Sequence, residues 1–262
     1  MRLIVVGPGR AGGAIALASR SAGHEVVGVL SRHPIEGWEN LEWDADLPEA
    51  DIALIAVRDD AIAEVVGRIA PHVDDVGVVA HLSGFTPVLA LREIQERGTA
   101  VGGFHPLQSL PDPETGSRAL AGSFVGIDGD PLAVDVLTHL ASSLGMEPFH
   151  LDDASRPAYH AAAAAASNFV VTALAVSADL FESAHIDPRV SRPLVERAVA
   201  NVFDKGPANS LTGPIARGDI ETVVGHLEVA HEVSSYVGRQ FRLIAEATAI
   251  RAGREEDLHR WR

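Results

Sequence analysis

Cysteine is absent from this chain of 262 residues. Its absence excludes disulfide bonds, thiolate nucleophiles and cysteine-ligated zinc or iron–sulfur centres. The chain has twelve histidines, but none of them forms an H-x-x-x-H or H-E-x-x-H pair, the spacings typical of helical zinc ligands. The sequence therefore predicts no metal site.

Lysine is almost absent. The chain has a single lysine, Lys205, among 21 basic residues, which a coding bias towards arginine is enough to explain. Any mechanism that needs a lysine as a Schiff base or a general acid must nevertheless use Lys205.

Positive charge is in deficit as well, because the formal net charge is −15. This balance disfavours nucleic acid and anionic membranes as partners, and solubility alone accounts for it. A hydrophobic fraction of 47% with 22% charged residues is ordinary for a well-buried protein long enough for two domains. The chain starts on an apolar strand without a signal peptide, so we expect a cytoplasmic protein.

A glycine-rich turn, GPGRAG at residues 7–12, directly follows the apolar run 3–6. In G-x-G-x-x-G the first glycine makes a tight turn, the second lets the backbone approach a pyrophosphate, and the third lets the next helix close on the strand. A helical pattern over 11–22 and an apolar strand over 25–30 complete a βαβ unit. This context predicts a Rossmann domain; the alternative is an α/β domain that binds no nucleotide. The predicted cofactor-binding residues are Gly7, Gly9, Arg10, Ala11, Gly12, Ser31, Arg32, Val57 and Arg58.

The position that selects the cofactor lies about twenty residues past the fingerprint, where NAD sites usually carry an acid. Here that position holds Ser31 and Arg32, and no acid lies between Glu25 and Glu36. A guanidinium binds phosphate oxygens through two parallel hydrogen bonds, so the pair suits a ribose 2′-phosphate. The sequence therefore predicts NADP (NADPH) as the cofactor, with a solvated loop arginine as the alternative.

Further apolar runs predict a doubly wound sheet, because parallel strands covered by helices on both faces are almost continuously apolar. The run 109–120, rich in Pro, Asp, Gly and Ser, predicts a loop. The chain then becomes nearly all helical from Pro157. The predicted strands lie at 51–57, 76–80, 99–104, 123–127 and near 148–150, and the predicted later helices at 157–185, 189–204 and 219–252.

These patterns predict an α/β domain over residues 1–151, followed by an all-α domain over 152–262. The segment 161–178 is free of formal charge and long enough to suggest a membrane span. We do not expect one, because the segment is alanine-rich, contains Ser167, Asn168 and Thr172, and lies inside a longer helix.

Ligands of open α/β sheets bind outside the carboxyl ends of the strands. Ser83 and His105 follow two of the predicted strands, although each side chain has an alternative role in holding a loop. On the long helix, His160 and Asn168 are about two turns apart and share a face. The predicted catalytic residues are His160, Asn168, Ser83 and His105, and Arg217 is a candidate to bind a substrate carboxylate.

Six motifs together resemble the Rossmann-like family with a DUF2520 C-terminal domain. The resemblance covers nearly the whole chain. It implies a layout similar to pyrroline-5-carboxylate reductases, prephenate dehydrogenases and ketopantoate reductases, with a helical domain like that of 6-phosphogluconate dehydrogenase and frequent dimerisation, so we expect a homodimer. The motifs are GPGRAG at 7–12, HLSG at 81–84, FHPLQ at 104–108, YH at 159–160, ASNF at 166–169 and LTGPIARGD at 211–219.

The chain departs from the wider superfamily in one respect. In the superfamily that this chain resembles, many β-hydroxyacid dehydrogenases and ketopantoate reductases have a catalytic lysine on the helix after the Rossmann domain. This chain has His160 and Asn168 in that region instead. We therefore expect a histidine acid or a lysine-free imine reduction. The predicted function is an NADP-dependent oxidoreductase that transfers hydride between nicotinamide and a small carbonyl, 2-hydroxy acid or imine. The alternative is a catalytically silent dinucleotide-binding sensor or scaffold.

Overall fold

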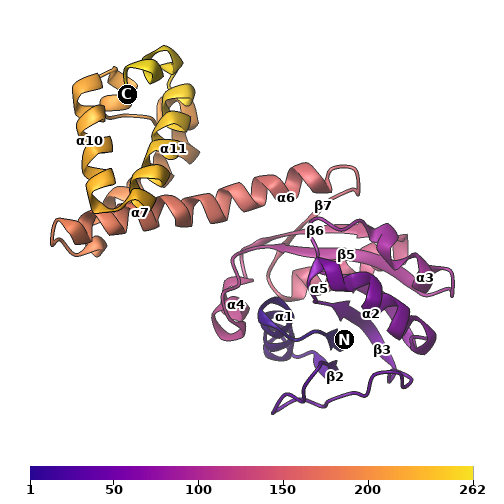
Figure 1. The fold of residues 1–262 in the computed structure, drawn as a ribbon. Coiled ribbons are helices and arrows are strands. Elements are labelled where there is room, and N and C mark those ends of the chain that lie inside the picture. Colours follow the sequence, from indigo (N-terminus) through magenta and orange to yellow (C-terminus); the bar gives the residue numbers. More distant parts are fainter. Residues whose placement is uncertain (262) are drawn as a thin grey trace. The chain divides into compact units, whose positions relative to one another are not determined.

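The chain folds into two compact units. The computed structural model describes residues 1–261, and their contacts divide the chain into Met1–Ala164 and a second unit that starts at Ala165. The first unit contains the sheet and the second consists of helices (Figure 1).

A seven-stranded sheet forms the centre of the first unit, in the order β2-β1-β3-β4-β5-β6-β7. Neighbouring strands run parallel, except that β6 pairs antiparallel with β5. The apolar pattern did not predict this reversal, since a buried strand has the same composition in either direction. The strands are β1 (Arg2–Val6), β2 (Glu25–Leu30), β3 (Ala50–Ile55), β4 (Val76–His81), β5 (Ala100–Leu107), β6 (Phe124–Gly129) and β7 (Glu147–His150).

Helices cover both faces of the sheet, which is why its central strands are apolar along their length. Ile4 of β1 belongs to the core on the face covered by α2, whereas its neighbour Leu3 packs with Ile15 of α1 and Leu137 of α5 on the opposite face. The predicted doubly wound Rossmann sheet is thus confirmed. The helices of this unit are α1 (Arg10–Ser21), α2 (Ile62–Ile69), α3 (Arg92–Gln95), α4 (Pro113–Ala119), α5 (Pro131–Ser143) and α6 (Arg156–Ala164).

The prediction of a loop over 109–120 is wrong, because most of this run forms α4. The carboxylate of Asp112 accepts the backbone N–H of Thr115 at 2.7 Å and so caps the helix. Gly116 lets α4 pack closely on α1, since a Cβ there would lie 2.9 Å from Cβ of Ala14. Pro, Asp and Gly are typical of loops, but they also suit a short capped helix.

The contacts place the division between the units later than the predicted boundary after residue 151. That boundary marks the end of the sheet, but α6 still packs against the first unit through Arg156, Tyr159 and His160. The division therefore falls at Ala164–Ala165, within the predicted long helix.

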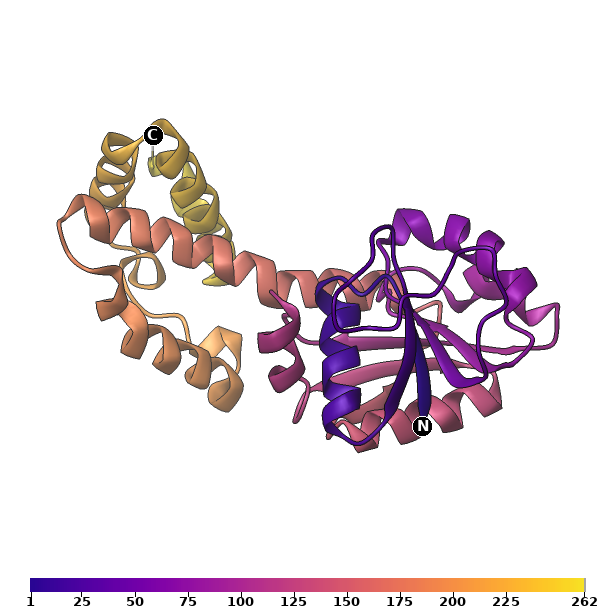
Figure 2. The ribbon, with the colours of Figure 1, turned by 90° about the horizontal axis from the view of Figure 1, so that it is seen from below.

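The second unit is built around α7, α10 and α11. Its buried residues form two small apolar clusters, one around Leu227 and Ala245 and another around Val176 and Ala230. In contrast, α8 has no buried residue and lies apart from α10 and α11 (Figure 2). The helices are α7 (Val170–Ser183), α8 (Arg192–Lys205), α9 (Pro214–Arg217), α10 (Ile220–Val233) and α11 (Ser235–Arg251), and a π-helical turn (Ala165–Phe169) precedes α7.

By length and composition, one helix of the described chain is able to cross a membrane. It is Arg156–Ser183, whose most apolar window has a mean hydropathy of 1.6 and is only 6% buried. Long apolar helices of soluble proteins have the same composition, so this observation by itself is weak evidence for a membrane span. It does show that a large apolar surface of this helix is left uncovered within one chain.

Candidate functional site

The glycine-rich turn between β1 and α1 has the geometry that a dinucleotide site requires. Gly7 has a φ of +85°, and a Cβ there would lie 2.6 Å from Cγ1 of Val57. A Cβ at Gly12 would lie 2.6 Å from the carbonyl oxygen of Gly7. Both positions therefore need glycine, one for the turn and one for the close approach of helix and strand.

Gly9 is different, because no described atom lies within 4 Å of the place that its Cβ would occupy. Gly9 is also the N-cap of α1 and provides no side-chain cap, and the first helical hydrogen bond runs from Gly13 to Gly9. The backbone N–H groups of Arg10, Ala11 and Gly12 are thus free to bind an anion. The residues present fit the pyrophosphate of a dinucleotide.

The predicted 2′-phosphate position lies at the end of β2. The Ser31 hydroxyl donates to the carbonyl of His33, and its own carbonyl accepts the indole N–H of Trp43 at 2.9 Å. Arg32 is exposed and has no ion pair among the described residues. Its guanidinium is accessible to a phosphate, and its role stays a prediction. Of the residues after β3, Val57 packs against Gly7, whereas the exposed Arg58 pairs with Asp60 at 2.9 Å.

Ser83 follows β4 and holds the next loop. Its Oγ accepts the backbone N–H groups of Phe85 at 3.1 Å and Thr86 at 2.8 Å. The hydroxyl proton is not used in these two bonds, so Ser83 remains able to donate to a ligand. Holding the loop and binding a ligand are therefore compatible.

An ion pair between the buried Arg156 and the partly exposed Asp153, which the sequence analysis missed, fixes that loop to α6. Arg156 is fully buried, and its Nε donates to Oδ1 of Asp153 at 2.7 Å while Nη1 donates to the carbonyl of Ser83 at 3.1 Å. Asp153 also accepts the backbone N–H of Val88 at 2.8 Å. The arrangement connects the loop after β4 with the first turn of α6.

Two of the predicted residues, His105 and His160, lie together beside this loop. Their ring centroids are 5.9 Å apart, and the ring of Phe85 lies 6.1 Å from that of His160. The Tyr159 hydroxyl, which the sequence analysis did not single out, lies 2.6 Å from Nδ1 of His105. A Cβ at Gly84 would lie 2.7 Å from Nε2 of His105, so Gly84 leaves room for this imidazole.

Burial and nearby cations keep the imidazoles of His105 and His81 neutral. Burial, followed by the nearby His160 and Arg156, lowers the pKa of His105 to about 4. Burial and Arg156 also lower the pKa of His81, which lies at the end of β4, to about 4. Burial raises the pKa of Tyr159 to about 12. At neutral pH the imidazoles of His105 and His81 are therefore neutral, and the phenol of Tyr159 is protonated.

Unpaired buried polar atoms concentrate in this part of the first unit. Nδ1 of His81, Nη2 of Arg156 and Nδ1 of His160 are buried and have no hydrogen-bond partner among residues 1–261. Such atoms are rare in folded proteins, because leaving a buried donor or acceptor unpaired costs about 1–3 kcal/mol. In this cluster they are available to hydrogen-bond a ligand or an ordered water molecule.

Asn168, the remaining predicted catalytic residue, belongs to the second unit. It is exposed and lies in the π-helical turn, where its carbonyl accepts the hydroxyl of Thr172 at 3.1 Å. Single π-helical turns inside α-helices are frequent at functional sites. The role of Asn168 stays a prediction.

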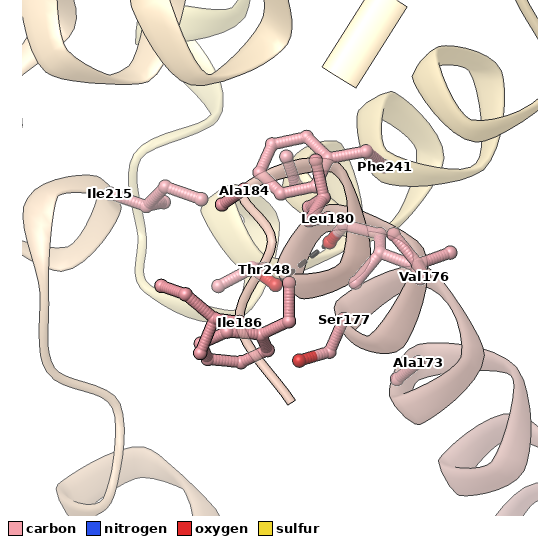
Figure 3. A pocket seen from close by; sticks show the side chains of 12 residues that line it. Ala173, Val176, Ser177, Leu180, Ala184, Ile186, Ile215, Phe241 and Thr248 are labelled. Carbon is pink, nitrogen blue, oxygen red and sulfur yellow. Dashed lines mark hydrogen bonds between the residues drawn. The ribbon is translucent and has the colours of Figure 1, made fainter. Parts of the chain in front are cut away.

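The second unit also has an apolar cavity of about 530 Å³. It lies between α7 and α11, with Ile186 and Ile215 at its edge (Figure 3). Its polar side chains are few, and one of them, Thr248, donates its hydroxyl to a carbonyl of its own helix at 2.8 Å. Among residues 1–261, no three His, Asp or Glu side chains form a group able to hold a metal ion.

Comparison with known proteins supports this description. Residues 123–248 match the family model described as Domain of unknown function (DUF2520). No curated protein matches the chain. Among solved structures, a Bacteroides fragilis protein described as an inferred NADP oxidoreductase has 22% identity and a TM-score of 0.78, and the match covers 95% of this chain and 97% of that one.

Two further solved structures are those of reductases. The Plasmodium falciparum pyrroline carboxylate reductase with NADP bound has 14% identity and a TM-score of 0.65, over 96% of this chain and 98% of the other. The Streptomyces aurantiacus imine reductase has 18% identity and a TM-score of 0.62, over 97% and 95%.

The chain therefore shares the fold of these structures, and residues 123–248, from β6 into α11, match the DUF2520 model. The predicted resemblance is confirmed at the level of family model and fold. At these identities the structural likeness establishes the fold alone.

Proposed function

We propose that the protein is an NADP-dependent oxidoreductase acting on a small carbonyl, 2-hydroxy acid or imine substrate. The observation that supports this proposal is that the glycine-rich turn and the cluster of His105 and His160 lie at the same edge of the sheet. β1, β3, β4 and β5 are neighbouring parallel strands, so the turn after β1 and the loop after β4 lie at the same edge. Three strand spacings, about 14 Å, separate β1 from β5. A dinucleotide whose pyrophosphate lies at Gly9 would extend along this edge towards His105.

The turn after β1 would hold NADPH, which would supply the hydride. His160 supplies the proton to the reacting atom of the substrate, so that a carbonyl becomes a hydroxyl and an imine becomes an amine. In the reverse direction His160 accepts this proton. The free hydroxyl proton of Ser83 donates a hydrogen bond that orients the same atom. His105, neutral and uncharged, adds a second donor without competing for the proton.

The preference for NADP rests on Arg32. Its guanidinium is exposed at the end of β2 and next to the hydroxyl-bearing Ser31, which is the arrangement that a 2′-phosphate needs. The nearest acidic residues along the chain, Glu25 and Glu36, lie outside this position.

We further propose a homodimer formed through the second unit. Val195, Val199 and Val202 of α8 recur at a helical spacing, and two further apolar side chains of this helix, Leu194 and Phe203, are 71% and 85% exposed. The same unit has an apolar cavity between α7 and α11. Each chain thus has one uncovered apolar helix and one apolar cavity. In a two-fold symmetric dimer, α8 of each copy would pack into the cavity of the other copy.

A second copy of the chain, rather than lipid, is therefore the proposed cover of these surfaces. The helix Arg156–Ser183 begins with an arginine that is paired inside the first unit, and the net charge of −15 disfavours anionic membranes and nucleic acid. We propose a cytoplasmic protein whose partners are a small molecule and its own copy.

The test is a calorimetric titration with NADPH and NADH, followed by measurement of NADPH absorbance with ketopantoate, prephenate-like acids and pyrroline-5-carboxylate. Tight NADPH binding with oxidation by one compound supports the enzyme and identifies its substrate class. His160→Ala should then lower kcat by about 10²- to 10⁴-fold at unchanged NADPH affinity. Binding without turnover would favour the sensor or scaffold, and absence of binding would contradict the proposal.

A further inference from the structure

Tyr159 and His105 form the closest side-chain contact of the cluster. The hydroxyl of Tyr159, on α6, lies 2.6 Å from Nδ1 of His105, on β5. The two rings meet edge to face, with centroids 5.4 Å apart and an interplanar angle of 89°. The Tyr159 ring also packs on Phe149 of β7 at 5.7 Å, so the phenol is held in place from two sides.

The protonation states decide which atom donates. Burial raises the pKa of Tyr159 to about 12 and, with His160 and Arg156, lowers that of His105 to about 4. The phenol therefore keeps its proton, and the imidazole is neutral with one N–H. No other hydrogen bond of the Tyr159 hydroxyl exists among residues 1–261, so an O–H turned away from Nδ1 would lack an acceptor in the protein. The contact therefore favours the hydroxyl as the donor and Nδ1 as the acceptor.

We propose that Tyr159 is a positioning residue: by donating to Nδ1 of His105, it holds the imidazole proton on Nε2, where it serves the substrate as a hydrogen-bond donor. This inference rests on the proposed function. It assigns His105 the polarisation of the reacting oxygen or nitrogen and leaves the proton transfer to His160.

The surroundings of Nε2 fit a donor that faces a ligand. No described group forms a hydrogen bond with Nε2, and this nitrogen is not fully buried. Gly84 lies directly against it, where any Cβ would approach to 2.7 Å. Arg156, His160 and His81 all oppose a positive charge on this ring. A neutral imidazole in such a site can still polarise a carbonyl.

The first experiment observes the tautomer without any turnover. Long-range ¹H–¹⁵N spectra of the full-length protein, labelled on histidine nitrogen, distinguish a protonated from a bare ring nitrogen, and the spectrum of His105→Gln assigns the His105 signals. We expect an Nε2–H tautomer in the wild type and a mixture of tautomers in Tyr159→Phe. An Nδ1–H tautomer in the wild type, or an unchanged spectrum in the variant, would overturn the proposal. Since neither cofactor nor substrate is needed, the result is independent of the proposed function.

The second experiment measures the coupling of the two residues in turnover. Tyr159→Phe retains the ring that packs on Phe149, and it should lower kcat about 2- to 12-fold, the equivalent of one neutral hydrogen bond, at unchanged NADPH affinity. A glutamine at position 105 carries an amide N–H that needs no tautomer. Tyr159→Phe should therefore have no further effect on kcat in the His105→Gln background. If the two substitutions instead lowered kcat independently, so that their fold-losses multiplied in the double variant, Tyr159 would not act through His105.

Discussion

Gly103 lies against the guanidinium of Arg156, so closely that a Cβ at position 103 would overlap Nη2. Gly103 of β5 pairs with His81 of β4 in the sheet, so both residues lie next to the candidate site. Glycine at 103 makes room for a fully buried cation, and that cation in turn fixes the loop that carries Ser83.

Gly103→Ala should destabilise the first unit, because Arg156 has to move and lose a bond to Asp153 or to the carbonyl of Ser83. A hydrogen bond to a charged group is worth about 1.5–3 kcal/mol. Urea unfolding measures the loss. Gly67→Ala is the control, since Gly67 is exposed within α2 and a Cβ there meets nothing closer than 4.0 Å; it should stabilise by about 1 kcal/mol. Equal stability of the two variants would refute the assigned role of Gly103.

Gly9→Ala should separate cofactor binding from folding. The new methyl group enters the space that the pyrophosphate is proposed to occupy, and it touches no described atom. We expect at least about a 10-fold rise in the Kd for NADPH, which corresponds to one lost contact of about 1.4 kcal/mol, at an unchanged melting temperature. Gly7→Ala should instead lower the melting temperature, because Gly7 has a φ of +85°. Calorimetry and thermal unfolding distinguish the two; unaltered affinity in Gly9→Ala would place the dinucleotide elsewhere.

Arg32→Ala tests the choice of cofactor. Loss of charge-assisted hydrogen bonds worth about 1.5–3 kcal/mol should weaken NADPH binding by roughly 10- to 150-fold. NADH has no 2′-phosphate, so its affinity should change little. Titration of both cofactors measures the ratio, and Arg97→Ala, another exposed arginine of the first unit, is the control. A parallel loss for NADPH and NADH would mean that Arg32 does not contact the 2′-phosphate.

The sequence predicted those parts of the protein that depend on local pattern. Continuous apolar runs indicated the strands, and the spacing of Gly7, Gly9 and Gly12 indicated the turn, because each glycine answers a steric demand within a short segment. Ser83 and His105 were found from a rule about strand ends. These predictions need no knowledge of distant contacts.

The remainder depends on contacts between residues far apart in the chain. Arg156 bonds to Ser83 across 73 residues, and Tyr159 reaches His105 across 54. Nothing in the composition around a solitary arginine or tyrosine distinguishes such a partner from a surface side chain. The antiparallel pairing of β6 was missed for the same reason, since it is set by the route of the chain between strands.

His81 predicts a pH dependence of stability. It is fully buried, and burial lowers its pKa to about 4 from the usual 6.5. Between these values the unfolded chain binds a proton that the folded protein does not, so the free energy of unfolding should fall as the pH drops from 6.5 to 4. The slope is on the order of 1.4 kcal/mol per pH unit for one group. Urea unfolding across this range measures it. His105, whose pKa is also lowered to about 4, contributes a similar slope, so His81→Gln should reduce the wild-type slope by about 1.4 kcal/mol per pH unit, whereas the exposed His33→Gln should leave it unchanged. A slope equal to that of the wild type in His81→Gln would show that another group is responsible.

Phe203→Asp tests the proposed dimer at its most exposed apolar side chain. Phe203 is 85% exposed and α8 has no buried residue, so the substitution removes no packing within one chain and should leave the melting of the first unit unchanged. In the proposed dimer, however, a carboxylate would be buried among the apolar side chains of α7 and α11 without a partner. We expect the dimer Kd to rise at least about 10-fold, as for other central interface residues. Sedimentation velocity over a concentration series measures it. Leu132→Asp places the same charge on a 56% exposed leucine of α5, in the first unit, and should leave the association unchanged. A monomeric wild type, or equal association of the two variants, would mean that α8 is not part of a dimer interface.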